Sequence, residues 1–235
     1  MLILKSLLFG MYFIKISYRN YLPLLFFLLL FNYIVQNINN PLLIFLSFIL
    51  YLVISSPICV NIYRGIILEK PLGNHYLQFL YEEYTKLFIK KLFVLISAII
   101  GIYIIHIMIL SPFIPQDISK MTIFLYVLFL YMIYIYTRLF FILPAAALGK
   151  SYSFKECYFM TKGNSIKIFL YYIALVIPYV ILNNYISDLF YSSKDYVGLV
   201  LGISFQMIFI VLSTSLVAYL YKGIIDSDPS LRIKD

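Results

Sequence analysis

Residues 92–110 read LFVLISAIIGIYIIHIMIL and contain no Lys, Arg, Asp or Glu. A helix needs about 20 mostly apolar residues to cross a hydrocarbon core about 30 Å thick, so this stretch is long enough to span a bilayer. Its apolar residues form a continuous run, without the alternation that marks a transmembrane β-strand. The stretch therefore predicts a transmembrane helix.

Five other stretches have the same character, so the sequence predicts an all-α polytopic membrane protein with six transmembrane helices. The expected spans are approximately Tyr21–Ile38, Pro41–Tyr63, Leu92–Leu110, Met121–Phe141, Ile166–Leu182 and Tyr196–Leu220. The composition agrees, because 63% of the residues are hydrophobic and 12% are charged. Soluble domains have about 45–50% and about 25%, so a soluble or disordered protein is excluded. The 24 Tyr and 21 Phe residues have A/T-rich codons, and we attribute much of this aromatic content to genome composition.

The basic residues are divided unevenly between the two sides of the predicted membrane. Of the 18 Lys and Arg residues, all but Lys120 and Lys194 fall in segments on one side. The positive-inside rule then places both termini in the cytoplasm. The net charge of +8 is explained by this topology and predicts contact with anionic lipid headgroups, without a nucleic-acid partner.

Neither cysteine is expected to form a disulfide. Cys59 and Cys157 both fall toward the cytoplasmic side, where thiols stay reduced. The first residues are not expected to form a cleaved signal peptide, because Lys15 and Arg19 interrupt the apolar run.

Three amphipathic segments are expected to lie in the membrane interface, each before a pair of spans. Residues 2–19 and 75–91 place basic residues at helical spacing among apolar ones, and Asn74 can cap the second segment. The third begins at Ser153 with a capping-box pattern and stops near Gly163. The chain is therefore expected to be a single integral membrane domain, 1–235, with units at approximately 1–63, 64–137 and 138–221 and a cytoplasmic tail at 222–235.

Residues 138–150, RLFFILPAAALGK, with residues 153–156, SFKE, and 162–164, KGN, resemble a group of bacterial inner-membrane proteins, many of them alphaproteobacterial. In that group an Arg-Leu…Leu-Pro-Ala…Gly stretch precedes a short amphipathic helix that ends in a basic-Gly-Asn turn. The layout is also similar to that of YciC-like and glycerophosphodiesterase-membrane-domain-like proteins. The resemblance implies a multi-pass, six-span bundle in the bacterial inner membrane, and it implies no particular activity.

Small residues on two spans are expected to pack helices together. Gly198 and Gly202 form a Gly-x-x-x-Gly pattern on the sixth span, and Gln206 continues their face. Small residues let two helices approach closely, and a buried amide adds a hydrogen bond between them. Ser97 and Gly101 form a similar but weaker face on the third span. These faces predict a contact within the fold or between two copies of the chain, with a substrate path as the minority alternative.

Two arginines fall at the cytoplasmic ends of predicted spans. Arg64 and Arg138 are expected to fix helix depth by extending toward the interface. The alternative is a clamp for a phosphate or a lipid headgroup, to which the forked guanidinium is suited.

Asn32, Asn61 and His106 are candidates for lining a polar pathway through the spans, together with Gln206. Histidine can titrate near neutral pH. A neutral His106 that is hydrogen-bonded to a neighbouring helix or to interfacial water is the favoured interpretation.

No pattern in the chain points to catalysis. All ten Asp and Glu residues fall outside the predicted spans. No nucleophile elbow, His-Glu metal motif or phosphate-binding Gly loop occurs. We therefore expect a protein that is not an enzyme and holds no cofactor or metal. A headgroup enzyme using His75, Arg64 and Arg138 is the weakest alternative, because no nucleophile or base accompanies these residues.

Two functions fit these features. The first is a non-catalytic scaffold or accessory component for another membrane protein, which fits the uncharged spans and the small-residue faces. The alternative is a transporter or permease subunit for a lipid or a weakly polar small molecule, which needs no buried charge. The expected partners are membrane lipids, and either another membrane protein or a second copy of the chain.

Overall fold

The computed structural model of the chain describes residues 2–16, 40–70, 82–110, 118–190 and 196–227, and the single positions 27, 31 and 35. Within these residues the protein is all-helical, without a strand. Five helices are long and apolar enough to cross a membrane: Pro41–Ile67, Glu83–Leu110, Phe124–Ala147, Ser165–Tyr185 and Ser204–Ser227. The predicted class, a helical membrane protein, is confirmed. The first predicted span, Tyr21–Ile38, lies outside the described residues except at single positions.

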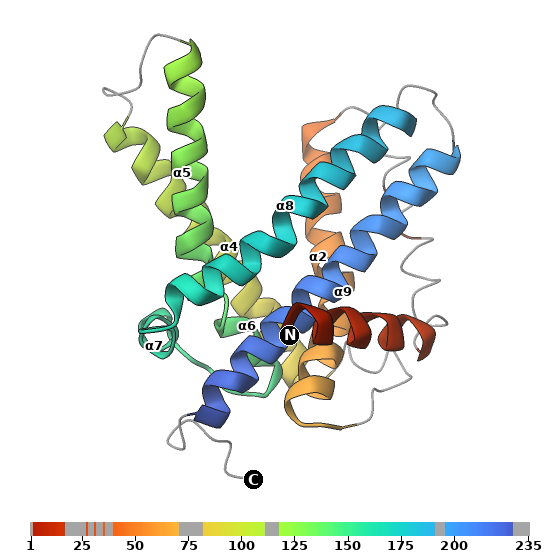
Figure 1. Cartoon of the computed structure of the whole chain (residues 1–235), viewed down its shortest axis with the longest axis vertical. Helices are drawn as coiled ribbons and strands as arrows, with labels where there is room; N and C mark the ends of the chain where they lie inside the picture. The colour runs from red at the N-terminus through yellow and green to blue at the C-terminus, as the bar shows by residue number, and fades with distance from the viewer. Residues whose placement is uncertain are drawn as a thin grey trace.

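The long helices form two diverging arms (Figure 1). One arm holds α4 (Glu83–Leu110) and α5 (Ile118–Leu139), and the other holds α2 (Pro41–Ile67), α8 (Ser165–Phe190) and α9 (Tyr196–Ser227). The short helices α6 (Ile142–Ala147) and α7 (Phe154–Met160) lie at the end where the arms meet. Residues 2–16 form a further helix that crosses α9 at a steep angle.

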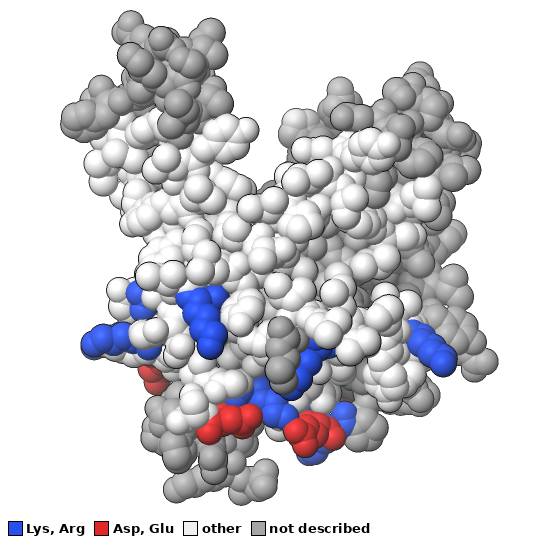
Figure 2. Space-filling view, in the orientation of Figure 1, with Lys and Arg blue, Asp and Glu red and all other residues white. Residues whose placement is uncertain are grey.

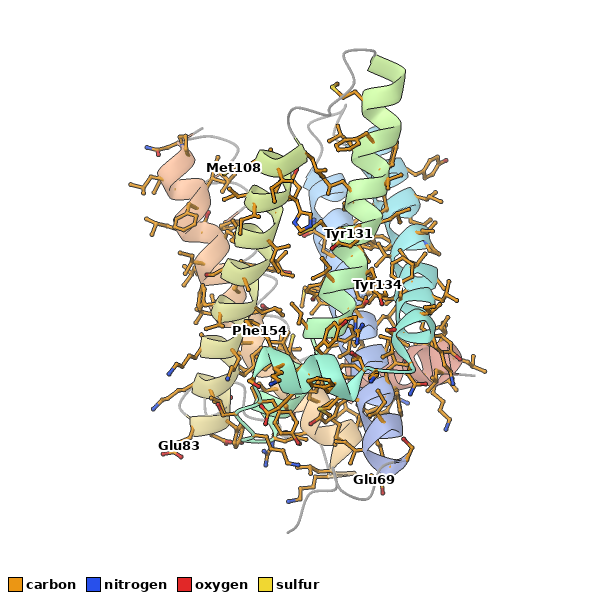
Figure 3. The ribbon with its side chains drawn as sticks, turned by 90° about the vertical axis from the view of Figure 1, so that its left-hand side faces the viewer. Glu69, Glu83, Met108, Tyr131, Tyr134 and Phe154 are labelled. Carbon is orange, nitrogen blue, oxygen red and sulfur yellow. The ribbon has the colours of Figure 1, made fainter. Side chains whose placement is uncertain are left out.

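Charged side chains gather at the end where the arms meet. On the face drawn in Figure 2, the described Lys and Arg side chains all lie near that end, which we call the basic end. Figure 3 shows Glu69 and Glu83 at the same end and Met108 at the opposite end of α4. Lys222 on α9 pairs there with Glu69, and this ion pair lowers the pKa of the Glu69 carboxyl. The charges therefore mark one membrane surface, as their distribution along the chain predicts.

The α4 helix differs from the prediction. An interfacial helix at residues 75–91 was expected to be separate from a span beginning at Leu92, yet one unbroken helix runs from Glu83 to Leu110. No Gly or Pro occurs between Glu83 and Leu92, so the backbone has no reason to break there. The predicted cap, Asn74, and the start of that segment lie outside the described residues.

The fourth span also differs, because it ends in a turn and a second short helix. The backbone turns at Phe140 and Phe141 after α5, and then α6 begins. Pro144 lies in the first turn of α6, where its missing N–H leaves no helical bond unmade. Gly149, with φ +79°, ends the turn that follows α6. All six residues of α6 are buried, and this helix contacts α2, α4 and α9.

The N-terminal helix packs through one narrow face. Ser6, Gly10 and Phe13 recur at helical spacing and are buried, while Leu4, Leu8 and other apolar side chains between them are exposed. The Ser215 hydroxyl of α9 lies 3.5 Å from the Ser6 carbonyl oxygen, to which it donates. The predicted helix at residues 2–19 is confirmed for the described residues 2–16. Its exposed apolar side suits the membrane interface.

The helix α7 begins as predicted and ends at Met160, three residues before the predicted stop at Gly163. The Ser153 hydroxyl accepts from the Glu156 N–H at 3.3 Å, and the Glu156 carboxylate accepts from the Ser153 N–H at 2.6 Å. This capping box lowers the pKa of Glu156, because its hydrogen bonds favour the carboxylate. Gly163, with φ +85°, allows the turn into α8.

Candidate ligand cavity

A cavity of about 220 Å³ lies where the two arms meet. Its walls come from α2, α4, α5, α6, α8 and α9. The lining residues are Tyr51, Leu52, Ser55, Ser56, Cys59, Tyr63, Phe88, Leu92, Tyr136, Phe140, Leu143, Tyr172, Ile210, Ser213, Thr214 and Val217. Nine of these carry a hydroxyl or a thiol, and none of the lining residues that the structure describes is charged.

The α2 wall owes its polarity to the sequence Ser55-Ser56-Pro57. Pro57 lies inside the helix and has no N–H to offer the carbonyl of Val53. The hydroxyls of Ser55 and Ser56 both donate to the Leu52 carbonyl, at 3.2 and 2.6 Å. Each hydroxyl has used its one proton on its own helix, so its remaining lone pairs can only accept from a ligand.

The α9 wall repeats this arrangement. Ser213 donates to the carbonyl of Ile210 at 3.1 Å, and Thr214 donates to the Cys59 sulfur of α2 at 3.5 Å. The Thr214–Cys59 contact also joins the two helices across the cavity wall. The serine and threonine hydroxyls of α2 and α9 therefore present hydrogen-bond acceptors to the cavity.

Aromatic rings form the wall from α5 and α8. The Tyr136 ring stands 5.8 Å from the Tyr172 ring and 5.6 Å from the Phe140 ring, measured between centroids. Phenolic hydroxyls can both donate and accept. Tyr51 and Tyr63 of α2 also line the cavity, so a small molecule here would meet serine and threonine acceptors together with phenol groups that can donate.

A second, larger hollow lies between α4 and α5, farther from the basic end. This groove has a volume of about 740 Å³. Its lining is apolar apart from two tyrosine hydroxyls: Ile99, Ile100, Tyr103, Leu125, Tyr126, Leu128, Phe129 and Met132. Apolar walls of this kind suit hydrocarbon.

Arg138 lies below the cavity and is committed to protein partners. Its Nε donates to the Thr161 hydroxyl at 3.2 Å, and one Nη donates to the Tyr158 carbonyl at 2.8 Å. The guanidinium also lies 3.5 Å from the centre of the Tyr158 ring. Arg138 is 8% exposed and holds α7 against the end of α5. Arg138 therefore joins two helices and does not extend toward the interface as expected, and its role in fixing helix depth stays a prediction.

Arg64 occupies a related position at the end of α2. Its Nη1 donates to the Ala147 carbonyl at the end of α6, at 3.2 Å. Its guanidinium lies 4.0 Å from the centre of the Tyr84 ring. Arg64 is half-buried, so it too joins helices at the basic end.

The role of the predicted packing residues stays a prediction, although Gly202 is buried in the structure. Gly198, Gly202 and Gln206 lie on α9. No atom of the described residues lies within 4 Å of a Cβ placed on Gly202 or on Gly101. Ser97 is exposed on α4. A contact between two copies of the chain through these faces stays a prediction.

The predicted polar pathway stays a prediction. Asn61 is buried in α2 and His106 is half-buried in α4, and neither lines the cavity. A ring nitrogen of His106 lies 2.7 Å from the carbonyl oxygen of Ile102 in its own helix. The His106 ring also lies 5.3 Å from the Tyr131 ring of α5, between centroids, and a hydrogen bond to a neighbouring helix or to water stays a prediction. Asn32 lies outside the described residues.

The cavity residues were missed by the sequence analysis. Ser55-Ser56-Pro57 is a visible signal, because a proline and two hydroxyls interrupt an apolar span. The tyrosines offer no such signal, since the four that line the cavity are among 24 in the chain. Among the described residues, no group of three His, Cys, Asp or Glu side chains could hold a metal ion.

Comparisons with protein-family models, with curated proteins and with solved structures find no match. The resemblance of residues 138–150 to the inner-membrane group stays a prediction.

Proposed function

We propose that the chain binds a weakly polar molecule in the cavity between its two arms, as a carrier or permease component for such molecules. The observation that supports this proposal is a hydroxyl-lined, uncharged cavity whose walls come from membrane-spanning helices. We also propose that the protein resides in the bacterial inner membrane with its basic end toward the cytoplasm, because Lys and Arg are retained on that side.

The chemistry of the cavity favours a neutral ligand that can donate and accept hydrogen bonds. The serine and threonine hydroxyls already donate to protein atoms, so a ligand hydroxyl or N–H could donate to their free lone pairs. A polar group buried in a bilayer is costly unless it is hydrogen-bonded in this way. A charged ligand would be desolvated without an opposite charge on the lining residues. The cavity would take a hydroxyl or an amide group more readily than a carboxylate or an amine.

The scaffold function remains the second proposal, and one experiment separates it from ligand binding. The full chain is extracted into lipid nanodiscs and analysed by native mass spectrometry. The expected result is a bound neutral small molecule or lipid that is depleted in the Thr214→Val and Tyr172→Phe variants. Tyr185→Phe, an exposed tyrosine of α8 outside the cavity, is the matched control. A stoichiometric protein partner, with no ligand that responds to these variants, would support the scaffold instead.

A further inference from the structure

We propose that the cavity and the α4–α5 groove together bind one lipid with a small, uncharged, hydroxyl-bearing head, of the acylglycerol class. This inference rests on the proposed function and names its ligand class. The head would occupy the cavity, and the chain would lie in the groove.

The groove and the cavity lie along the same faces of α4 and α5. On α5, Met132 lines the groove and Tyr136 lines the cavity, one helical turn apart. On α4, Ile99 lines the groove and Leu92 lines the cavity, two turns apart. Residues spaced by four or seven positions share a helix face. An elongated molecule can therefore follow one continuous stripe on both helices.

The depth of this stripe matches one leaflet of a bilayer. Leu92 directly follows Lys90 and Lys91, and Tyr136 lies two residues before Arg138, so the cavity is just inside the basic-end interface. From Leu92 to Tyr103, α4 rises about 16 Å. Half of a hydrocarbon core is about 15 Å thick. A lipid of the basic-end leaflet would thus keep its normal depth and orientation.

The head is limited in size and charge by the cavity. Its volume of about 220 Å³ leaves room for a small head. The two nearby arginines direct donors to protein atoms, Arg64 to Ala147 and Arg138 to Thr161 and Tyr158. Neither arginine lines the cavity, so a phosphate would find no cation among its walls. A glycerol-sized head with free hydroxyls fits these limits.

The test uses the full chain in nanodiscs and a monoacylglycerol probe with a diazirine at the end of its acyl chain. After irradiation, we expect crosslinks on groove peptides that contain Tyr103 and Phe129, and competition by unlabelled monoacylglycerol. A lysophosphatidic acid probe with the same chain should label these peptides about tenfold less. Equal labelling by the two probes would contradict the proposal and would indicate ordinary bilayer lipid in the groove.

Variants at the position where the groove meets the cavity, which we call the junction, test whether the head and the acyl chain of the lipid share one site. Met132→Trp should reduce crosslinking by the monoacylglycerol about tenfold by obstructing the stripe. Val127→Trp, which adds the same bulk to an exposed position of α5, should leave it unchanged. Ile99→Phe provides a milder second obstruction if Met132→Trp fails to fold. Unchanged crosslinking in a folded junction variant would overturn the shared site.

A short diazirine alcohol without an acyl chain separates the two proposals. If it labels α2 and α9 peptides in a manner that Thr214→Val abolishes, the cavity binds neutral molecules. If the junction variants then leave crosslinking by the monoacylglycerol unchanged, only the proposal of a lipid ligand is overturned. If neither probe responds to any cavity or junction variant, both proposals fail.

Discussion

Gly10 lets the N-terminal helix lie directly on α9. A Cβ on this residue would stand 2.8 Å from a methyl carbon of Leu212, closer than real side chains approach. An alanine can be accommodated, because that methyl is at the flexible end of a side chain and alanine favours the helix. A leucine cannot, since its branch would have to occupy space that α9 fills.

Gly10→Leu is therefore expected to destabilise the docked N-terminal helix by about 1–3 kcal/mol. Thermal unfolding of the detergent-solubilised chain, followed by size-exclusion chromatography, would measure the loss. Gly202→Leu is the matched comparison, because the described residues leave its Cβ position open. A lower midpoint for Gly202→Leu, or a change in its oligomeric state, would instead reveal a contact between two copies of the chain.

These two glycines show what a small-residue pattern can predict. Gly198 and Gly202 have the familiar spacing, yet no described atom that would mark a close contact lies within 4 Å of a Cβ placed on Gly202. Ser6 and Gly10 have the same four-residue spacing within an amphipathic segment and make a close contact with α9. Small residues permit close approach but do not specify the partner. The partner depends on the fold, which one sequence does not reveal at the level of single residues.

At the scale of elements, α7 depends on Arg138 for its position. This helix has only seven residues and is too short to be stable alone. Arg138 joins it to α5 through two hydrogen bonds and a ring contact, as described above. Cys157 of α7 is fully buried, and burial raises the pKa of its thiol to about 12. A docked α7 should therefore keep Cys157 almost unreactive.

Arg138→Lys is expected to increase the rate of maleimide labelling of Cys157 near pH 8 by about tenfold or more. Lysine cannot reproduce the two hydrogen bonds of the guanidinium or its stacking on the Tyr158 ring, so α7 should separate more often from α5. When α7 separates from α5, the Cys157 thiol becomes hydrated and its pKa falls, which increases the thiolate fraction. Mass spectrometry of the modified peptide measures the rate. Lys162→Gln, at an exposed turn position, is the control, and equal rates in all three proteins would show that Arg138 does not hold α7.

The elements differ in how far local sequence determines them. The start of α7 was predictable, because the capping box involves residues only three positions apart. The unbroken α4 was not, since a change from amphipathic to apolar residues alters the environment of a helix without breaking its backbone. The turn between α5 and α6 was also unpredictable, because α6 is stabilised by burial against distant helices.

At the scale of the whole molecule, membrane class was predictable and the cavity was not. Apolar runs long enough to cross a bilayer are a local property, so five spans recur in the structure near their expected positions. The cavity needs residues from six helices, and each contributes only a few ordinary side chains. Tyr51, Tyr136 and Tyr172 acquire a shared role only when α2, α5 and α8 meet.

The position of the charges leads to a test of the orientation of the molecule. Single cysteines at Asn39, Gln116 and Ser192 should react with a membrane-impermeant maleimide in intact cells, because they fall on the side with few basic residues. Cysteines at Lys86 and Lys155 should react only after the membrane is opened. These substitutions are made in a Cys59→Ala, Cys157→Ala background, so that each variant carries a single cysteine. The background protein is first checked to be as soluble as the native chain. Labelling of the Lys86 or Lys155 positions in intact cells would reverse the orientation and place the cavity in the outer leaflet.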